Sequence, residues 1–245
     1  MTVTRPSRAP DVVAATLRRQ ILSGELAAGD CLPNEGELIS QLGVSRETVR
    51  MALRLLDAEG LTATSQGRSG VRIRHPEPER VARSLVQLFT LTGATWGDLL
   101  SFRIMLEPAA AAHVAEHATA AQRKRIAEVA AGGIAADGTG YHEFHEELVE
   151  ASGNPLLTTV LAAVEQAVRW AAAEQNISQY DRDEAAKSHR AIAAAVSAKD
   201  PQKAQRRMAQ HLSAALRHVE ASGLRDAPMI PPSRWRGENS DLPWR

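Results

Sequence analysis

The chain lacks several features that whole classes of protein depend on. It has one cysteine, Cys31, among 245 residues, so no internal disulfide framework is possible and a reducing cytoplasm is the expected compartment. Aromatic residues make up 4% of the chain, too few for a protein that binds single-stranded nucleic acid by base stacking. No apolar run is long enough to cross a bilayer, and the N-terminal residues lack a signal-peptide pattern. We therefore expect no membrane partner.

The charge of the chain also lacks a dominant sign, because its formal net charge is zero. Residues 1–75 contain ten arginines and eight acidic residues, a net charge of +2. Any binding to nucleic acid must therefore depend on where the basic side chains lie, and dimerisation would double the contact area. The length leaves room for two domains.

One segment arranges basic side chains along a predicted helix. Residues 45–50 read Ser-Arg-Glu-Thr-Val-Arg, and the Ser45 hydroxyl can cap a helix that begins after it. Apolar residues then recur with helical spacing and predict one buried stripe: Val49, Ala52, Leu53 and Leu56. Three arginines recur every four residues on another stripe: Arg46, Arg50 and Arg54. Such a stripe is typical of a solvated face, but it also suits contacts with phosphates and guanine edges.

The neighbouring segments predict a winged helix-turn-helix around this helix. A first helix ends near Gly24, and Asn34 can cap a second, short helix that ends at Gly43. The short turn before the third helix has the length expected in a helix-turn-helix. Residues 61–64 and 71–74 alternate apolar and polar side chains, which predicts a two-stranded wing with a glycine-containing tip.

With these motifs, residues 10–75 resemble the DNA-binding domain of the GntR family of bacterial transcription regulators. The resemblance implies that Arg46 and Arg50 contact bases and that the wing tip enters the minor groove. It assigns DNA contacts to eight residues: Ser45, Arg46, Glu47, Thr48, Arg50, Gln66, Gly67 and Arg68. Gly36 departs from the pattern, because family members often have Arg or Lys there. One DNA contact is therefore missing, and we expect a different operator.

A mainly α fold is expected, with the winged helix-turn-helix followed by an all-α bundle. Helical patterns cover seven further segments: 79–91, 96–118, 120–133, 141–152, 155–178, 181–199 and 201–221. The predicted division has four parts: a DNA-binding domain, 1–75; a linker, 76–80; an all-α ligand-binding and dimerisation domain, 81–222; and an irregular tail, 223–245. This tail is expected to be disordered or to wrap a dimer mate. The arrangement resembles the FadR subfamily, whose all-α effector domain is called FCD.

The resemblance to FCD domains implies a metal site built from three histidines: His145, His189 and His211. Neutral imidazoles suit Zn²⁺, Ni²⁺ or a similar divalent cation. The family's fourth ligand is an Asp, and here that position is Tyr141. Three alternatives follow. Water or an effector completes a three-histidine site, or His142 becomes the fourth ligand. In the third alternative no metal binds, and Tyr141 donates a hydrogen bond directly to an organic ligand.

Four residues are candidates for effector binding: Arg103, Tyr141, His142 and Asn154. Arg103 and Glu107 match the family's Arg-x-x-x-Glu, a spacing typical of a helix salt bridge. Alternatively, Arg103 faces a cavity and binds a carboxylate, which its planar guanidinium suits. Asn154 has the position of a helix cap, although the family places this Asn near the pocket. 

These patterns predict a dimeric regulator, expected to act as a repressor, that binds a short palindromic operator of double-stranded DNA. A small organic acid would bind at or near the metal and change the DNA affinity. Two alternatives make the histidines themselves the functional centre: a metal-sensing protein, or a hydrolase with Glu143 or Glu146 as general base. The hydrolase alternative leaves the winged helix unexplained, and the chain has no Gly-x-Ser-x-Gly motif. We therefore expect no enzyme.

Overall fold

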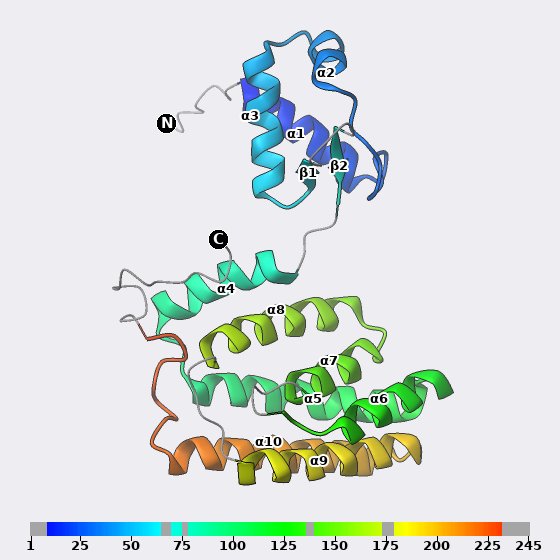
Figure 1. The fold of residues 1–245 in the computed structure, drawn as a ribbon, viewed down its shortest axis with the longest axis vertical. Helices are drawn as coiled ribbons and strands as arrows, with labels where there is room; N and C mark the ends of the chain where they lie inside the picture. Colours follow the sequence, from blue (N-terminus) through cyan, green and yellow to red (C-terminus); the bar gives the residue numbers. More distant parts are fainter. Residues whose placement is uncertain (1–8, 65–69, 75–77, 136–139, 173–178, 232–245) are drawn as a thin grey trace, which may run out of the picture. The chain divides into compact units, whose positions relative to one another are not determined.

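The computed structural model describes residues 9–64, 70–74, 78–135, 140–172 and 179–231. Within these residues the fold is mainly α, as predicted, with ten helices and a single two-stranded sheet (Figure 1). The chain divides into two compact units, residues 1–80 and 81–245. No described helix is both long enough and apolar enough to cross a membrane.

The first unit is the predicted winged helix-turn-helix. Its elements are α1 (Ala9–Leu22), α2 (Glu35–Leu42), α3 (Arg46–Ala58), β1 (Thr62–Thr64) and β2 (Val71–Ile73). The strands pair antiparallel, with Thr62 opposite Ile73. α1 packs against α3, and the core includes the apolar stripe expected from the sequence: Val49, Ala52, Leu53 and Leu56. 

Side-chain caps fix the turn between α2 and α3. Asn34 Oδ1 accepts a hydrogen bond from the Glu37 amide, and the Glu37 side chain accepts one from the Asn34 amide. Gly43 ends α2 with a left-handed φ of 65°. Ser45 Oγ then accepts a hydrogen bond from the Thr48 amide at the start of α3. The predicted caps are confirmed, and they set the direction in which α3 leaves the turn.

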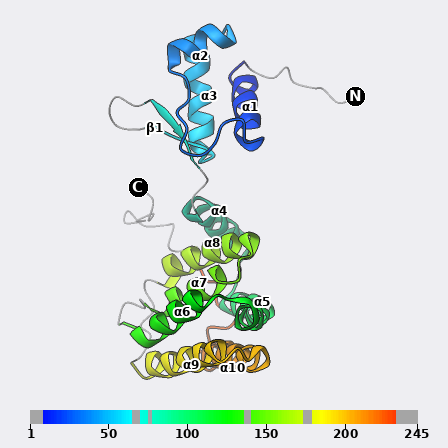
Figure 2. The same cartoon turned by 90° about the vertical axis from the view of Figure 1, so that its right-hand side faces the viewer.

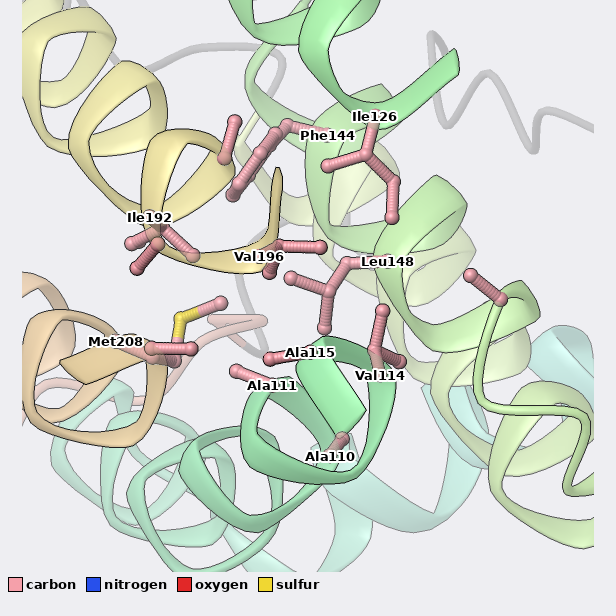
Figure 3. Packing of buried hydrophobic residues seen from close by; sticks show 14 of the residues in the cluster. Ala110, Ala111, Val114, Ala115, Ile126, Phe144, Leu148, Ile192, Val196 and Met208 are labelled. Atoms are coloured by element: carbon pink, nitrogen blue, oxygen red, sulfur yellow. The ribbon is translucent and has the colours of Figure 1, made fainter. Parts of the chain in front are cut away.

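The second unit is an all-α bundle. Its helices are α4 (Pro78–Thr92), α5 (Trp96–His117), α6 (Ala120–Gly132), α7 (Tyr141–Glu150), α8 (Pro155–Ala172), α9 (Gln179–Ser197) and α10 (Pro201–Ala221). α10 packs along both α5 and α9, and α7 packs against α8 (Figures 1 and 2). Residues 173–178, predicted to extend α8, lie outside the described residues. Figure 3 shows Phe144, Leu148 and Ile192 among the side chains that fill the apolar interior of this bundle.

The segment that follows α10 is irregular but packs against its own chain. The Gly97 amide donates to the Arg225 carbonyl over 2.9 Å, and the Met229 amide donates to the Ala94 carbonyl over the same distance. The side chains of Met229 and Ile230 are buried in a cluster with residues of α4, α5 and α8. Residues 223–231, which we call the strap, therefore pack against their own chain, and the expectation of disorder is wrong for this part of the tail. Contact with a dimer mate stays a prediction. Met229 and Ile230 anchor the strap, although its sequence has no periodic pattern of apolar residues.

We expect Ile230→Ala to lower the free energy of unfolding by about 2–5 kcal/mol, because it leaves a cavity under the strap. Ile230 is 1% exposed, whereas Leu224 in the same segment is 37% exposed. Leu224→Ala is therefore the matched control, with an expected change below about 1 kcal/mol. Urea unfolding followed by circular dichroism measures both. Equal losses in the two variants would show that the strap does not pack as described.

Candidate DNA-binding surface and metal centre

The arginines of α3 lie on its solvent face. Arg46, Arg50 and Arg54 are exposed, while the apolar stripe of the same helix is buried. Ser45 and Glu47 are exposed as well, and Thr48 is partly exposed beside the cap. The recognition-helix residues predicted to contact DNA therefore share one accessible end of α3. The predicted wing-tip contacts, Gln66, Gly67 and Arg68, lie outside the described residues.

Arg50 is held in place by an acidic residue of α2. Its Nε donates to both carboxylate oxygens of Glu35, over 3.1 and 3.0 Å. The Arg50 side chain nevertheless remains 56% exposed. The sequence pattern did not identify this contact, because it depends on the turn that brings the start of α2 beside α3.

The three predicted histidines come together inside the second unit. His145 lies on α7, His189 on α9 and His211 on α10, and all three side chains are buried. One ring nitrogen from each lies within 4.8 Å of those of the other two. Nε2 of His145 and Nε2 of His211 are 3.3 Å apart. Ligands from three different helices therefore converge on one point.

A carboxylate orients His145 toward this point. Glu107 Oε2 lies 2.6 Å from Nδ1 of His145, and Glu107 Oε1 accepts a hydrogen bond from Arg103 Nε. With Nδ1 donating to Glu107, Nε2 of His145 is free of its proton and faces the other two rings. Burial opposes ionisation of Glu107, but the charge of Arg103 and the contact with His145 hold its pKa well below the usual range.

The electrostatics keep the imidazoles neutral. Burial lowers the pKa of His145, His189 and His211. Repulsion from neighbouring rings lowers the pKa of His189 and His211 further, whereas Glu107 partly offsets the effect of burial on His145. Nε2 of His189 is buried and has no hydrogen-bond partner among the described residues. An unsatisfied buried nitrogen is unfavourable unless a ligand binds it. Three neutral ring nitrogens around one point fit a borderline divalent cation such as Zn²⁺ or Ni²⁺.

Tyr141 lies against the cluster, at the position of the family's acidic ligand. Its ring centroid is 5.2 Å from that of His145, 5.4 Å from that of His189 and 5.9 Å from that of His211. Burial raises the pKa of the phenol, and the nearby Arg103 offsets this in part. The phenol therefore stays protonated near neutral pH. The ligand set consequently carries no negative charge of its own.

The other two effector candidates lie apart from this point. Nδ1 of His142 contacts a carboxylate oxygen of Glu165 and is not one of the converging ring nitrogens. Asn154 is exposed and caps α8, where its Oδ1 accepts hydrogen bonds from the amides of Leu156 and Leu157. The structure therefore shows Asn154 in the helix-cap role and places it outside the cluster.

The sequence pattern missed Glu165, a buried acidic residue of α8. Its Oε1 lies 3.3 Å from Arg103 NH2, and its Oε2 contacts His142. Arg103 is therefore buried between two carboxylates, Glu107 and Glu165, and the salt-bridge interpretation describes its contacts. The available signal was a single acidic residue within a mostly apolar run, Ala-Ala-Val-Glu-Gln-Ala-Val.

The general bases of the hydrolase alternative do not join the histidines either. Glu143 is exposed, and Glu146 is ion-paired with Arg169 over 2.5 Å. Neither carboxylate belongs to the group of converging ligands. The geometry therefore favours a binding site over a hydrolytic centre.

Each of the two units matches the model of a known protein family. Residues 10–73 match the model of the bacterial regulatory proteins of the gntR family, and residues 98–214 match the FCD domain. The chain belongs to the GntR family. This regulator has a GntR-type DNA-binding domain followed by an FCD domain, and such domains are those of transcription regulators, not of enzymes.

Similar proteins are regulators as well. The chain is 27% identical over 215 residues to the HTH-type transcriptional repressor NanR of Cronobacter sakazakii, covering 83% of this chain and 82% of that protein. It is 30% identical over 165 residues to the Glc operon transcriptional activator of Escherichia coli K12. That match covers 63% of this chain and spans 65% of the activator's length. Among solved structures, Streptococcus agalactiae GntR has a TM-score of 0.62 at 27% identity, covering 85% of this chain and 99% of the other.

The neutral histidines predict an acid-sensitive metal-free protein. Because burial holds the folded pKa of His189 and His211 well below the usual histidine value of about 6.5, the unfolded chain binds more protons than the folded chain as the pH falls below that value. Stability is therefore retained above about pH 6.5 and lost progressively on acidification below it. Urea unfolding in chelator at pH 7.5 and 5.0 measures this loss. His113→Gln, at an exposed histidine of α5, should leave the loss unchanged.

Proposed function

We propose that this GntR-family chain is a repressor that binds a short palindromic operator as a homodimer. A small organic acid, bound at a metal held by His145, His189 and His211, changes its affinity for DNA. The observation that carries the proposal is the presence, in one chain, of an exposed arginine helix and a buried cluster of neutral histidines.

The DNA-binding part rests on α3. Arg46 and Arg50 are exposed at its beginning, and a guanidinium can donate two hydrogen bonds to the major-groove edge of guanine. The net charge of the chain is zero, so its contacts with phosphates depend on the local placement of basic side chains, and a second copy would double them. Two copies related by a two-fold axis would present two recognition helices to an inverted repeat. DNA binding of this kind implies a cytoplasmic protein.

The metal-binding part of the proposal rests on two observations. Nε2 of His189 has no hydrogen-bond partner among the described residues, and Glu107 orients His145. Three histidines would hold Zn²⁺ or Ni²⁺ and leave at least one coordination position for water or an effector, because Tyr141 is neutral. The bound cation would act as a Lewis acid that accepts a carboxylate oxygen. A small carboxylic acid is therefore the proposed effector class.

Coupling between the two parts requires the effector to prefer one arrangement of the dimer. The metal would join α7, α9 and α10, so a change in its coordination would alter the packing of these helices. A preference of about 1.4 kcal/mol for the arrangement that does not bind DNA changes operator affinity tenfold.

The test compares operator affinity in three states: stripped of metal, loaded with Zn²⁺, and loaded with Zn²⁺ in the presence of small carboxylic acids. We expect one or more acids to weaken binding at least tenfold, and only when Zn²⁺ is present. A full response to Zn²⁺ alone would favour a metal sensor, and turnover of ester substrates would favour the hydrolase. Identical affinity in all three states would contradict the proposal.

A further inference from the structure

The proposed metal site is surrounded by an unequal number of buried charges. Arg103 is 2% exposed, and two carboxylates with similarly low exposure face it, those of Glu107 at 1% and Glu165 at 2%. This group therefore holds two carboxylates and one guanidinium in the interior of the bundle, and His142 is a further basic side chain that contacts it. A buried excess charge is costly unless an opposite charge or a set of hydrogen bonds compensates it.

Glu165 is the less completely hydrogen-bonded of the two carboxylates. Glu107 is satisfied on both sides, because its two oxygens contact Arg103 Nε and His145 Nδ1. Glu165 Oε1 instead has no hydrogen-bond partner among the described residues, although Arg103 NH2 lies 3.3 Å away. His142, whose side chain is 15% exposed, contacts the other oxygen and holds the carboxylate in the interior. Glu165 therefore has unused capacity to stabilise a cation.

We propose that Glu165 is a positioning and charge-compensating residue for the divalent cation, and that it replaces the negative charge that Tyr141 cannot provide. The inference rests on the proposed metal site. Glu165 contacts Arg103, Arg103 contacts Glu107, and Glu107 orients His145, so Glu165 acts on the ligands through this chain of contacts.

The direct test is the Zn²⁺ dissociation constant of Glu165→Gln, measured on the full chain by competition with a chelator of known affinity. Because this change removes the charge and keeps the size, we expect the constant to rise about 10- to 100-fold. The matched control is Glu128→Gln, an exposed residue paired with Lys124 on α6, which should change it less than twofold. Thermal unfolding of the metal-free variants reports whether they fold.

A second variant separates charge from packing. Tyr141→Asp puts a carboxylate at the cluster, and we expect it to lower the Zn²⁺ dissociation constant at least tenfold. Combined with Glu165→Gln, it should return the constant to the parent value or below, because the net charge is restored. If Glu165 acted only through packing, Tyr141→Asp would not restore the Zn²⁺ dissociation constant of the Glu165→Gln variant in this way. If Glu165→Gln does not fold on its own, the comparison of Tyr141→Asp with the combined variant decides, and equal Zn²⁺ dissociation constants for these two overturn the inference.

The outcomes distinguish this inference from the function on which it rests. If the parent chain binds Zn²⁺ and Glu165→Gln binds it equally well, the role of Glu165 is contradicted and the metal site stands. If the parent chain binds no Zn²⁺, the metal site falls and the inference falls with it. 

Discussion

Arg50→Ala should weaken binding to the operator without changing the affinity for metal. Arg50 is exposed on the recognition helix, and a bidentate contact with a base contributes about 1–3 kcal/mol, or roughly 5- to 150-fold in affinity. Fluorescence anisotropy on a short duplex, at one fixed salt concentration, measures the loss. Zn²⁺ affinity measured on the same sample shows that the FCD unit is intact.

The control for this prediction is an arginine of the other unit. Arg125 is exposed on α6 and forms an ion pair with Glu147, so Arg125→Ala removes the same charge far from α3 in the sequence. We expect its operator affinity to stay within twofold of the parent. If the operator affinities of Arg50→Ala and Arg125→Ala both equal that of the parent, α3 is not the recognition helix.

The combined change His189→Ala and His211→Ala should abolish metal retention. Two of the three converging ring nitrogens are removed, and a single histidine with neutral neighbours does not hold a divalent cation. Elemental analysis after dialysis should show about one metal ion per chain for the parent and almost none for the variant. The DNA-binding unit should stay folded, because its core is separate from this cluster.

A matched pair of histidines provides the control for metal retention. His113 and His117 lie on α5 with stacked rings 4.2 Å apart, and both are exposed. His113→Ala combined with His117→Ala should leave the metal content unchanged. A parent protein that retains no metal after incubation with Zn²⁺ or Ni²⁺ would favour the remaining alternative, in which Tyr141 donates a hydrogen bond directly to an organic ligand.

The parts of the fold that depend on local chemistry could be predicted from the sequence. Asn34 and Ser45 cap their helices because a short polar side chain reaches the free amides of the next turn. Gly43 ends α2 because glycine adopts the left-handed conformation without steric cost. The helices of the bundle followed in the same way from caps, glycines and apolar spacing. Convergence of the three histidines was expected from the family resemblance alone, since spacing does not bring three helices together.

The parts that depend on packing could not be predicted. Glu35 and Arg50 meet because of a turn, and Glu165 meets Arg103 because α8 packs beside the cluster. Met229 anchors the strap although the segment has no periodic pattern. These contacts join residues far apart in the sequence, and no local propensity encodes them. Among them, the contact between Glu165 and Arg103 is the one on which the proposed role of Glu165 in metal binding rests.

The most direct test of the whole account is selection of bound sequences from a random double-stranded DNA library by the purified full-length protein. The account predicts enrichment of a short inverted repeat, and loss of that enrichment in Arg50→Ala. Retention of bulk DNA without any enriched sequence, or the same enriched sequence with Arg50→Ala, would contradict it.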